Sequence, residues 1–149
     1  MTIYFGADHA GFERKERLKT SFMGEGYVVE DLGAHTLDPS DDYPVIAERV
    51  ARAIQKDPDA RGVLLCGNAE GVCMAANKID GVRAAIGYAP EAAEGARRDD
   101  DANILCLPGA LLDDATVHAA LRAFLATPFE QAARQTRRLE QIKKLEEEN

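Results

Sequence analysis

A cysteine stands directly before a glycine-containing loop near the middle of the chain. Cys66 ends an apolar run of β-strand character, and the loop Gly67-Asn68-Ala69-Glu70-Gly71 leads from it into a helical pattern. Glycines at both ends of such a loop allow backbone N–H groups to converge on an oxyanion at a helix start, which also lowers the pKa of a nearby thiol. The loop matches neither a Walker phosphate loop nor a dinucleotide fingerprint. Cys66 is therefore either a reactive thiolate or a small buried hydrophobic residue, and we expect a structural role for Cys73 and Cys106.

The dipeptide Asp8-His9 follows the first apolar run of the chain. One interpretation is structural: an aspartate that caps a helix, beside a surface histidine. The other is functional: a carboxylate and an imidazole aimed at polar oxygens of a ligand. The sequence has only three histidines, and one of them follows a predicted strand, which favours the functional interpretation.

Three arginines gather near the C-terminus, so that Arg134 shares one helix face with Arg137 and Arg138. A solvated, salt-bridging face is the ordinary explanation for such a run. Guanidinium groups also bind phosphate oxygens in bidentate fashion, so a phosphate clamp is the alternative.

These residues lie among segments that alternate between strand-like and helix-like patterns. The predicted strands are 3–7, 27–32, 63–66, 82–88 and 103–107, and the predicted helices are 12–23, 44–54, 72–79, 90–101, 113–126 and 129–147. Five strand–helix units in succession predict an α/β fold, with a parallel sheet covered by helices on both faces. Ligands bind at the carboxyl ends of such strands. The segments expected at that edge are Asp8-His9, Asp38–Tyr43, Cys66–Gly71, Gly87-Tyr88 and Pro108–Ala110.

Length and charge narrow the class of protein. A chain of 149 residues fits a single domain spanning 1–149. Its formal net charge of −8 argues against nucleic acid and anionic membranes as partners, because both are held by excess lysine and arginine. No stretch approaches the roughly 18 apolar residues of a membrane span, and the N-terminus lacks the basic flank of a signal peptide. Since the three cysteines lack metal-ligand spacing, we expect a reduced, cytoplasmic protein without a metal.

Several short motifs occur in a fixed order along nearly the whole chain. They are Gly6-Ala7-Asp8-His9-Ala10-Gly11, Asp42-Tyr43-Pro44, Cys66-Gly67, Ala75-Ala76-Asn77-Lys78, Gly81-Val82-Arg83-Ala84-Ala85, Asp101-Ala102-Asn103 and Phe129-Glu130. Together they resemble the family of type B ribose-5-phosphate isomerases and galactose-6-phosphate isomerases. The resemblance implies a Rossmann-like three-layer α/β/α sandwich with a five-stranded parallel sheet. It also implies interconversion of an aldose phosphate and a ketose phosphate without metal or organic cofactor.

The resemblance implies roles for individual residues. Cys66 matches the base that moves a proton between C1 and C2, and the loop from Gly67 to Gly71 supplies amides that hold the enediolate oxygen. Asp8 and His9 match residues that handle the ring oxygen and the sugar or phosphate end. Tyr43 matches a pocket residue.

The resemblance further implies a homodimer or homotetramer with the active site at the subunit interface. The last predicted helix, about 129–147, carries Leu139, Ile142 and Leu145 as a narrow apolar stripe. We expect this helix to pack on a second subunit.

Five positions depart from the family pattern, and most of them change the charge of the pocket. They are Asn68 for a hydroxyl residue, Asp99 for a histidine, Asp100 for an asparagine, and Ala110 and Ala133 for arginines. Carboxylates repel a phosphate dianion but accept hydrogen bonds from sugar hydroxyls. We therefore expect an altered substrate pocket, in which Asp100 contacts the substrate, Arg134 substitutes for the arginine lost at 133, and Arg137 assists it.

The sequence thus predicts an intramolecular aldose–ketose isomerase acting on a sugar phosphate or a related sugar through an enediolate. Cys66 is the predicted base, with Asn68 beside it, and Glu70 is either solvent-facing or a contact to a sugar hydroxyl. Asp99 replaces the missing histidine in ring opening if Asp100 and Asp101 raise its pKa. The alternative function is a non-catalytic sugar-binding protein or a partner subunit of a galactose-6-phosphate isomerase-like complex.

Overall fold

Strands and helices alternate along the chain. In the computed structural model, which describes residues 1–148, there are five strands and six helices. In chain order they are β1 (Thr2–Ala7), α1 (Phe12–Gly24), β2 (Val28–Asp31), α2 (Tyr43–Lys56), β3 (Arg61–Cys66), α3 (Glu70–Ala76), β4 (Ala84–Ile86), α4 (Pro90–Asp100), β5 (Ile104–Pro108), α5 (Asp114–Ala126) and α6 (Ala133–Glu147). Asn149, the last residue of the predicted domain, lies outside the described residues.

The five strands form one parallel sheet in the order β2-β1-β3-β5-β4. β1 and β3 are neighbours, with Phe5 paired with Val63, and β5 follows, with Cys66 opposite Pro108. After β1 the chain continues into β2, on one side of the β1–β3 pair. After β3 it continues into β4, on the other side of that pair. Doubly wound sheets bind ligands at such a change in strand order, beyond the carboxyl ends of the strands.

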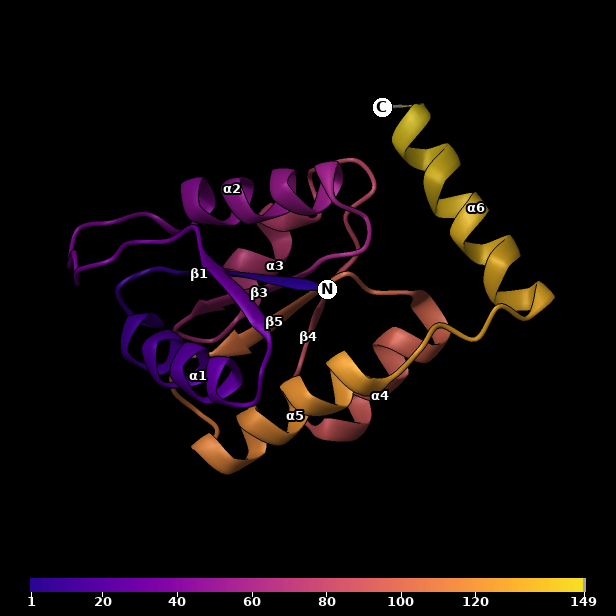
Figure 1. Cartoon of the computed structure of the whole chain (residues 1–149). Helices are drawn as coiled ribbons and strands as arrows, with labels where there is room; N and C mark the ends of the chain where they lie inside the picture. Colours follow the sequence, from indigo (N-terminus) through magenta and orange to yellow (C-terminus); the bar gives the residue numbers. More distant parts are fainter. Residues whose placement is uncertain (149) are drawn as a thin grey trace.

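Helices cover both faces of the sheet, which gives three layers (Figure 1). Successive residues of β3 face opposite ways, as the pleat of a strand requires. Leu65 packs with apolar residues of α1, α4 and α5, whereas Leu64 and Cys66 pack with those of α2 and α3. The predicted α/β/α sandwich with a five-stranded parallel sheet is confirmed.

Two predicted elements begin two or more residues later than the sequence pattern indicates. β4 starts at Ala84 and not at residue 82, because the N–H of Arg83 donates to the side chain of Asn103 at 2.8 Å and not to a neighbouring strand. α6 starts at Ala133 and not at residue 129. The N–H of Glu130 donates to the carbonyl of Arg98 at 2.9 Å, so this segment is tied to the end of α4 and does not extend the helix.

The third helix is shifted toward the loop that precedes it. α3 begins at Glu70, two residues before the predicted start, and its last residue is Ala76. The side-chain oxygen of Asn68 accepts the N–H of Glu70 at 3.2 Å and supports this early start. After Ala76 the chain turns tightly, with the N–H of Ile79 donating to the carbonyl of Ala76.

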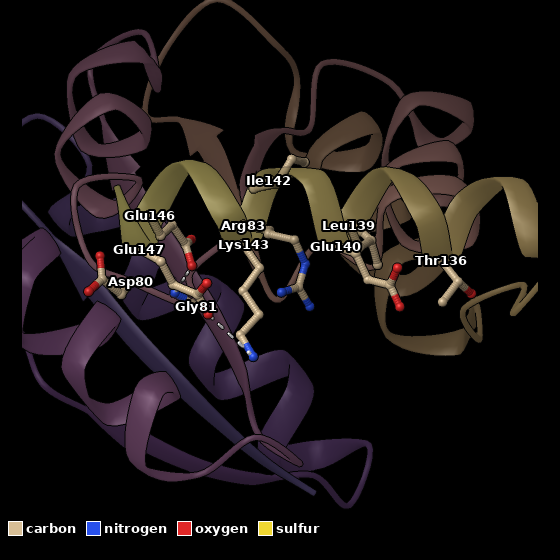
Figure 2. Close-up of a pocket in the computed structure, with 10 residues that line it drawn as sticks. All are labelled: Asp80, Gly81, Arg83, Thr136, Leu139, Glu140, Ile142, Lys143, Glu146 and Glu147. Atoms are coloured by element: carbon tan, nitrogen blue, oxygen red, sulfur yellow. Dashed lines mark hydrogen bonds and ion pairs between the residues drawn. The ribbon is translucent and has the colours of Figure 1, made fainter. Parts of the chain in front are cut away.

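α6 projects from the sandwich at the C-terminal end of the chain (Figure 1). A groove of about 470 Å³ lies between α6 and the Asp80–Gly81 turn, and its lining residues include Leu139 and Ile142 of the helix (Figure 2). Ile142 and Leu145 are exposed. The expectation that this stripe packs on a second subunit stays a prediction.

Within residues 1–148, no helix combines the length and the apolar character needed to cross a lipid bilayer.

Candidate active site

Asp8 forms a tight turn at the end of β1. Its Oδ1 accepts the N–H groups of Ala10 at 3.0 Å and Gly11 at 3.1 Å, directly before α1. Its own N–H donates to the carbonyl of Leu65 on β3 at 3.2 Å, and the residue is buried. Asp8 therefore closes the turn before α1 but does not cap the helix, because the N-cap is Gly11 and, among the described residues, no side chain bonds to the first turn. Within residues 1–148 no partner is found for Oδ2, so one carboxylate oxygen can accept from a ligand.

His9 is exposed and is held by an aspartate from another loop. Asp41 Oδ1 accepts the backbone N–H of His9 at 2.8 Å and lies 2.9 Å from its Nδ1. The hydrogen bond to Asp41 raises the pKa of His9 above its usual value. Burial opposes this rise, and the charge of Asp8 adds to it. Asp41 also fixes the imidazole so that Nε2 is the nitrogen directed away from this pair.

Cys66 is the last residue of β3 and is buried. Its Sγ lies 3.9 Å from Oδ1 of Asn68, which also accepts the N–H of Glu70. Ala69, which lies between Asn68 and Glu70, adopts a left-handed conformation with φ of 71° and turns the chain sharply into α3. The first N–H groups of a helix have no partner within the helix, so the N–H groups that follow Glu70 are suited to an anionic oxygen.

The ring of Tyr43 packs on the same loop. A Cβ atom added to Gly71 would lie 2.7 Å from Cζ of Tyr43, so the glycine leaves the space that the ring occupies. Tyr43 is the first residue of α2, and Gly71 is the second residue of α3. The structure therefore brings Asp8, His9 and Tyr43 to the carboxyl ends of β1 and β3, beside Cys66.

The loop after β5 closes this edge of the sheet. The N–H of Gly109 donates to the carbonyl of Cys66 at 2.7 Å, and that of Ala110 donates to the carbonyl of Gly67 at 3.3 Å. A Cβ on Gly109 would lie 2.2 Å from the carbonyl oxygen of Ala10, so no side chain fits there. Ala110 is exposed beside the candidate base, at a position where the resembled family has an arginine.

Four of the predicted site residues lie elsewhere. Asp99 and Asp100 end α4, just before β5 begins, which places them at the amino-terminal edge of the sheet. Arg134 and Arg137 lie near the start of α6, and the segment before this helix is tied to the end of α4 by the bond from the N–H of Glu130 to the carbonyl of Arg98. Within one chain these residues are at the edge opposite Cys66.

The expected rise in the pKa of Asp99 does not occur. The guanidinium of Arg98 donates to Asp99 at 2.9 Å, and this hydrogen bond lowers the pKa of the carboxyl group. Asp101 pairs instead with Arg83 and Arg97, each at 2.7 Å, so its charge is compensated. The condition for Asp99 to replace the histidine in ring opening, a pKa raised by Asp100 and Asp101, is therefore not met within one chain.

Similarity to known proteins decides the family. The model of the ribose/galactose isomerase family matches residues 3–142. Ribose-5-phosphate isomerase B of Mycolicibacterium paratuberculosis is 36% identical over 140 residues, which cover 94% of this chain and 88% of that protein. The chain belongs to the ribose/galactose isomerase family.

Solved structures of the ribose/galactose isomerase family share the fold. The crystal structure of ribose-5-phosphate isomerase B from Mycoplasma genitalium, with bound ribulose 5-phosphate, has a TM-score of 0.95 and 37% identity, covering 99% of this chain and 97% of that one. A 4-deoxy-4-sulfo-D-erythrose isomerase of a Clostridium species is 37% identical over 131 residues, which cover 87% of this chain and 81% of that protein. The expected enzyme class, an aldose–ketose isomerase of sugar phosphates, is confirmed, and the non-catalytic alternative is not favoured.

Three residues around this site were not predicted from the sequence. Asp41 belongs to a loop that was expected at the ligand edge, but it is one of three aspartates there, with Asp38 and Asp42. No pattern in the sequence distinguishes the one that reaches His9. Lys15 and Asp31, which hold the start of the same loop, were also missed.

Proposed function

We propose that the enzyme interconverts a short aldose and its ketose that carry a terminal anionic group, with a sugar phosphate as the first candidate, in a pocket that differs from that of ribose-5-phosphate isomerases. The observation that carries this proposal is the position of Cys66, at the carboxyl end of β3 and next to the start of α3. The names of the relatives support a sugar phosphate as the class of substrate.

Cys66 is the proposed base. Its thiolate removes the proton from C2 of the aldose, the electrons form the C1–C2 double bond of an enediolate, and the negative charge develops on O1. The thiol then returns the proton to C1, while the hydroxyl proton of O2 passes to O1, so that O2 becomes the ketose carbonyl and O1 becomes the C1 hydroxyl. Backbone N–H groups of the Gly67–Gly71 loop stabilise the oxygen on which charge develops.

Asp8, His9 and Tyr43 are the proposed contacts to the sugar. The Oδ2 atom of Asp8 accepts from a sugar hydroxyl, and the exposed imidazole of His9 donates to the ring oxygen or to the anionic end. Asn68 donates from its amide to a hydroxyl oxygen and does not relay a proton. Glu70 is exposed at the first position of α3, so it contacts at most a sugar hydroxyl.

A second copy of the chain completes the proposed site as a homodimer or homotetramer. Asp99, Asp100, Arg134 and Arg137 lie too far around the sheet to reach Cys66 of their own chain, and the exposed stripe of α6 is suited to contact between copies. In this arrangement Arg134 and Arg137 hold the anionic end, and Asp99 and Asp100 contact hydroxyls. We place this assembly in the cytoplasm, without nucleic acid, membrane or cofactor.

A sulfonated sugar is the second candidate substrate. A sulfonate carries one negative charge and a phosphate up to two, so it needs fewer cations. The exposed Ala110 beside the Cys66 loop, where the family has an arginine, is the observation that favours it. A relative that is named for 4-deoxy-4-sulfo-D-erythrose adds support.

The test is proton exchange in heavy water. The enzyme is incubated with ribose 5-phosphate, erythrose 4-phosphate, 4-deoxy-4-sulfo-D-erythrose and unphosphorylated ribose, and the products are followed by NMR. An isomerase introduces deuterium at C1 or C2 of at least one compound. Exchange in none of them, with binding retained, would contradict the proposed function.

A further inference from the structure

A lysine of α1 is completely buried. Lys15 has no exposed side-chain surface, yet it carries a positive charge, which is costly to bury without partners. Its Nζ donates to Oδ2 of Asp31 at 2.7 Å and to the carbonyl oxygen of Ala34 at 2.6 Å. The mechanism above assigns no role to this residue.

Both acceptors of Lys15 belong to the start of the loop that follows β2. Asp31 ends β2, and its Oδ1 accepts the N–H of Gly33 at 2.9 Å. Burial alone raises the pKa of Asp31, but hydrogen bonds from Lys15, Lys19 and the N–H of Gly33 outweigh it, so the pKa lies below its usual value. The loop therefore begins on a charged, hydrogen-bonded anchor.

The loop start also packs closely against the end of β1, the strand that leads to Asp8. A Cβ on Gly33 would lie 3.1 Å from the backbone nitrogen of Ala7 and 3.3 Å from Cα of Gly6. The loop cannot shift inward here without meeting the end of β1.

The other end of the loop holds the imidazole. Asp41 accepts the N–H and faces the Nδ1 of His9, as described above. The loop projects from the sheet between β2 and α2 (Figure 1), so its position depends on its two anchored ends.

We propose that Lys15 is a positioning residue: by holding the carbonyl of Ala34 and the carboxylate of Asp31, it sets the loop that places Asp41 against His9. The consequence for catalysis rests on the proposed function. The consequence for the imidazole does not, because it depends only on the Asp41 contact.

The decisive variant is Lys15→Met, which keeps the length of the buried chain and removes its donor. We expect kcat/KM to fall by about 10- to 100-fold, because a displaced contact group costs that much. We also expect the pKa of His9 to fall toward about 6.5, its ordinary value. The pKa is measured by NMR titration of the His9 ring, identified by its absence from a His9→Gln variant. The charged groups that face this ring are Asp8, Asp38 and Asp41.

Lys19→Met is the matched control. Lys19 also bonds to Asp31, but it makes no contact with the carbonyl of Ala34 among the described residues. The control should leave the His9 pKa unchanged, and its kcat/KM should stay within about twofold of the parent enzyme. Lys15→Arg keeps a charged donor and should restore part of both values.

Two results would overturn the proposal: an unchanged His9 titration in Lys15→Met, or equal effects in Lys15→Met and Lys19→Met. If Lys15→Met does not fold, Lys15→Gln, which keeps a shorter polar donor, is measured in the same way and judged by the same criteria. If the parent enzyme isomerises none of the sugars, the proposed function fails while the His9 titration still decides the role of Lys15.

Discussion

The ring of Tyr43 occupies the space in which a side chain at Gly71 would begin. Its Cζ would lie 2.7 Å and its Cε2 2.9 Å from a Cβ on Gly71, distances that real Cβ atoms do not show. The first turn of α2 and the first turn of α3 therefore approach each other only because residue 71 is a glycine. This contact fixes one wall of the candidate active site.

Replacing Gly71 by alanine should push the Tyr43 ring out of the site. We expect Gly71→Ala to lower kcat/KM by about 10- to 100-fold. Folding stability should change by less than about 1 kcal/mol, since the half-exposed ring can move and alanine favours a helix. Gly24→Ala is the control, because no atom lies within 4 Å of its added Cβ. Equal activity in the two variants would show that the Tyr43 contact is dispensable.

The identity of the base can be tested by two variants from one loop. Cys66→Ala should abolish deuterium exchange at C2, with a loss of at least ~10²-fold, which is typical when a general base is removed. Glu70→Gln should cost much less, because Glu70 is exposed at the start of α3. Cys73→Ala serves as a control for the removal of a thiol. A larger loss in Glu70→Gln than in Cys66→Ala would transfer the role of base to Glu70.

The charge of Asp41 should be visible in the titration of His9. Since the pKa of His9 is raised in the folded state, its ion pair with Asp41 stabilises the fold below the unfolded pKa of about 6.5 and is lost as the pH rises through the folded pKa. Asp41→Asn keeps the hydrogen-bond acceptor and should lower the pKa of His9 in an NMR titration. Asp38→Asn should have a smaller effect. A pKa unchanged by Asp41→Asn would mean that the contact does not persist in solution.

The absence of arginine at Ala110 and Ala133 predicts weak binding of a phosphate dianion. Each absent charged hydrogen bond costs roughly 1.5–3 kcal/mol of binding. Ribose 5-phosphate should therefore be a poor substrate, and Ala110→Arg combined with Ala133→Arg should lower its KM. Efficient turnover of ribose 5-phosphate by the parent enzyme would show instead that Arg134, Arg137 and Arg138 suffice.

Leu111 is held in an unfavourable backbone conformation. Its φ is 70°, in the left-handed region, and it is 80% exposed. Packing of the side chain therefore contributes little stability that could offset the backbone strain. Leu111→Gly should raise the free energy of unfolding by about 1 kcal/mol, because glycine adopts this region without strain. Leu111→Ala keeps the Cβ and should give no such gain in urea denaturation. Equal stability of all three proteins would rule out strain at this position.

The ends of β1 and β3 could be predicted from the sequence, whereas the hydrogen-bond partners of the residues that follow them could not. The apolar run before Cys66 and the glycine-bounded loop after it place the thiol at a strand end, and the structure agrees. The charges near Asp99 are those of its neighbours in sequence, but which of them form pairs could not be predicted. Asp101 has a φ of 46°, which turns its carboxylate toward Arg83 and Arg97, and Arg98 folds back onto Asp99.

The same limit explains the missed Asp41. Three aspartates of one loop are equivalent in composition, and only the anchored path of the chain decides which one reaches His9. Contacts between distant segments, in contrast to periodic burial, leave no pattern within a single sequence.

Cys66 and Arg134 lie at opposite edges of one sheet, which has a genetic consequence if two copies share each site. In a mixed dimer of one chain damaged at Cys66 and another damaged at Arg134, one site would carry both lesions and the other neither. Two inactive alleles present in the same cell would then restore activity to each other. Lesions at the two edges would fall into separate complementation groups, although they lie in a single gene.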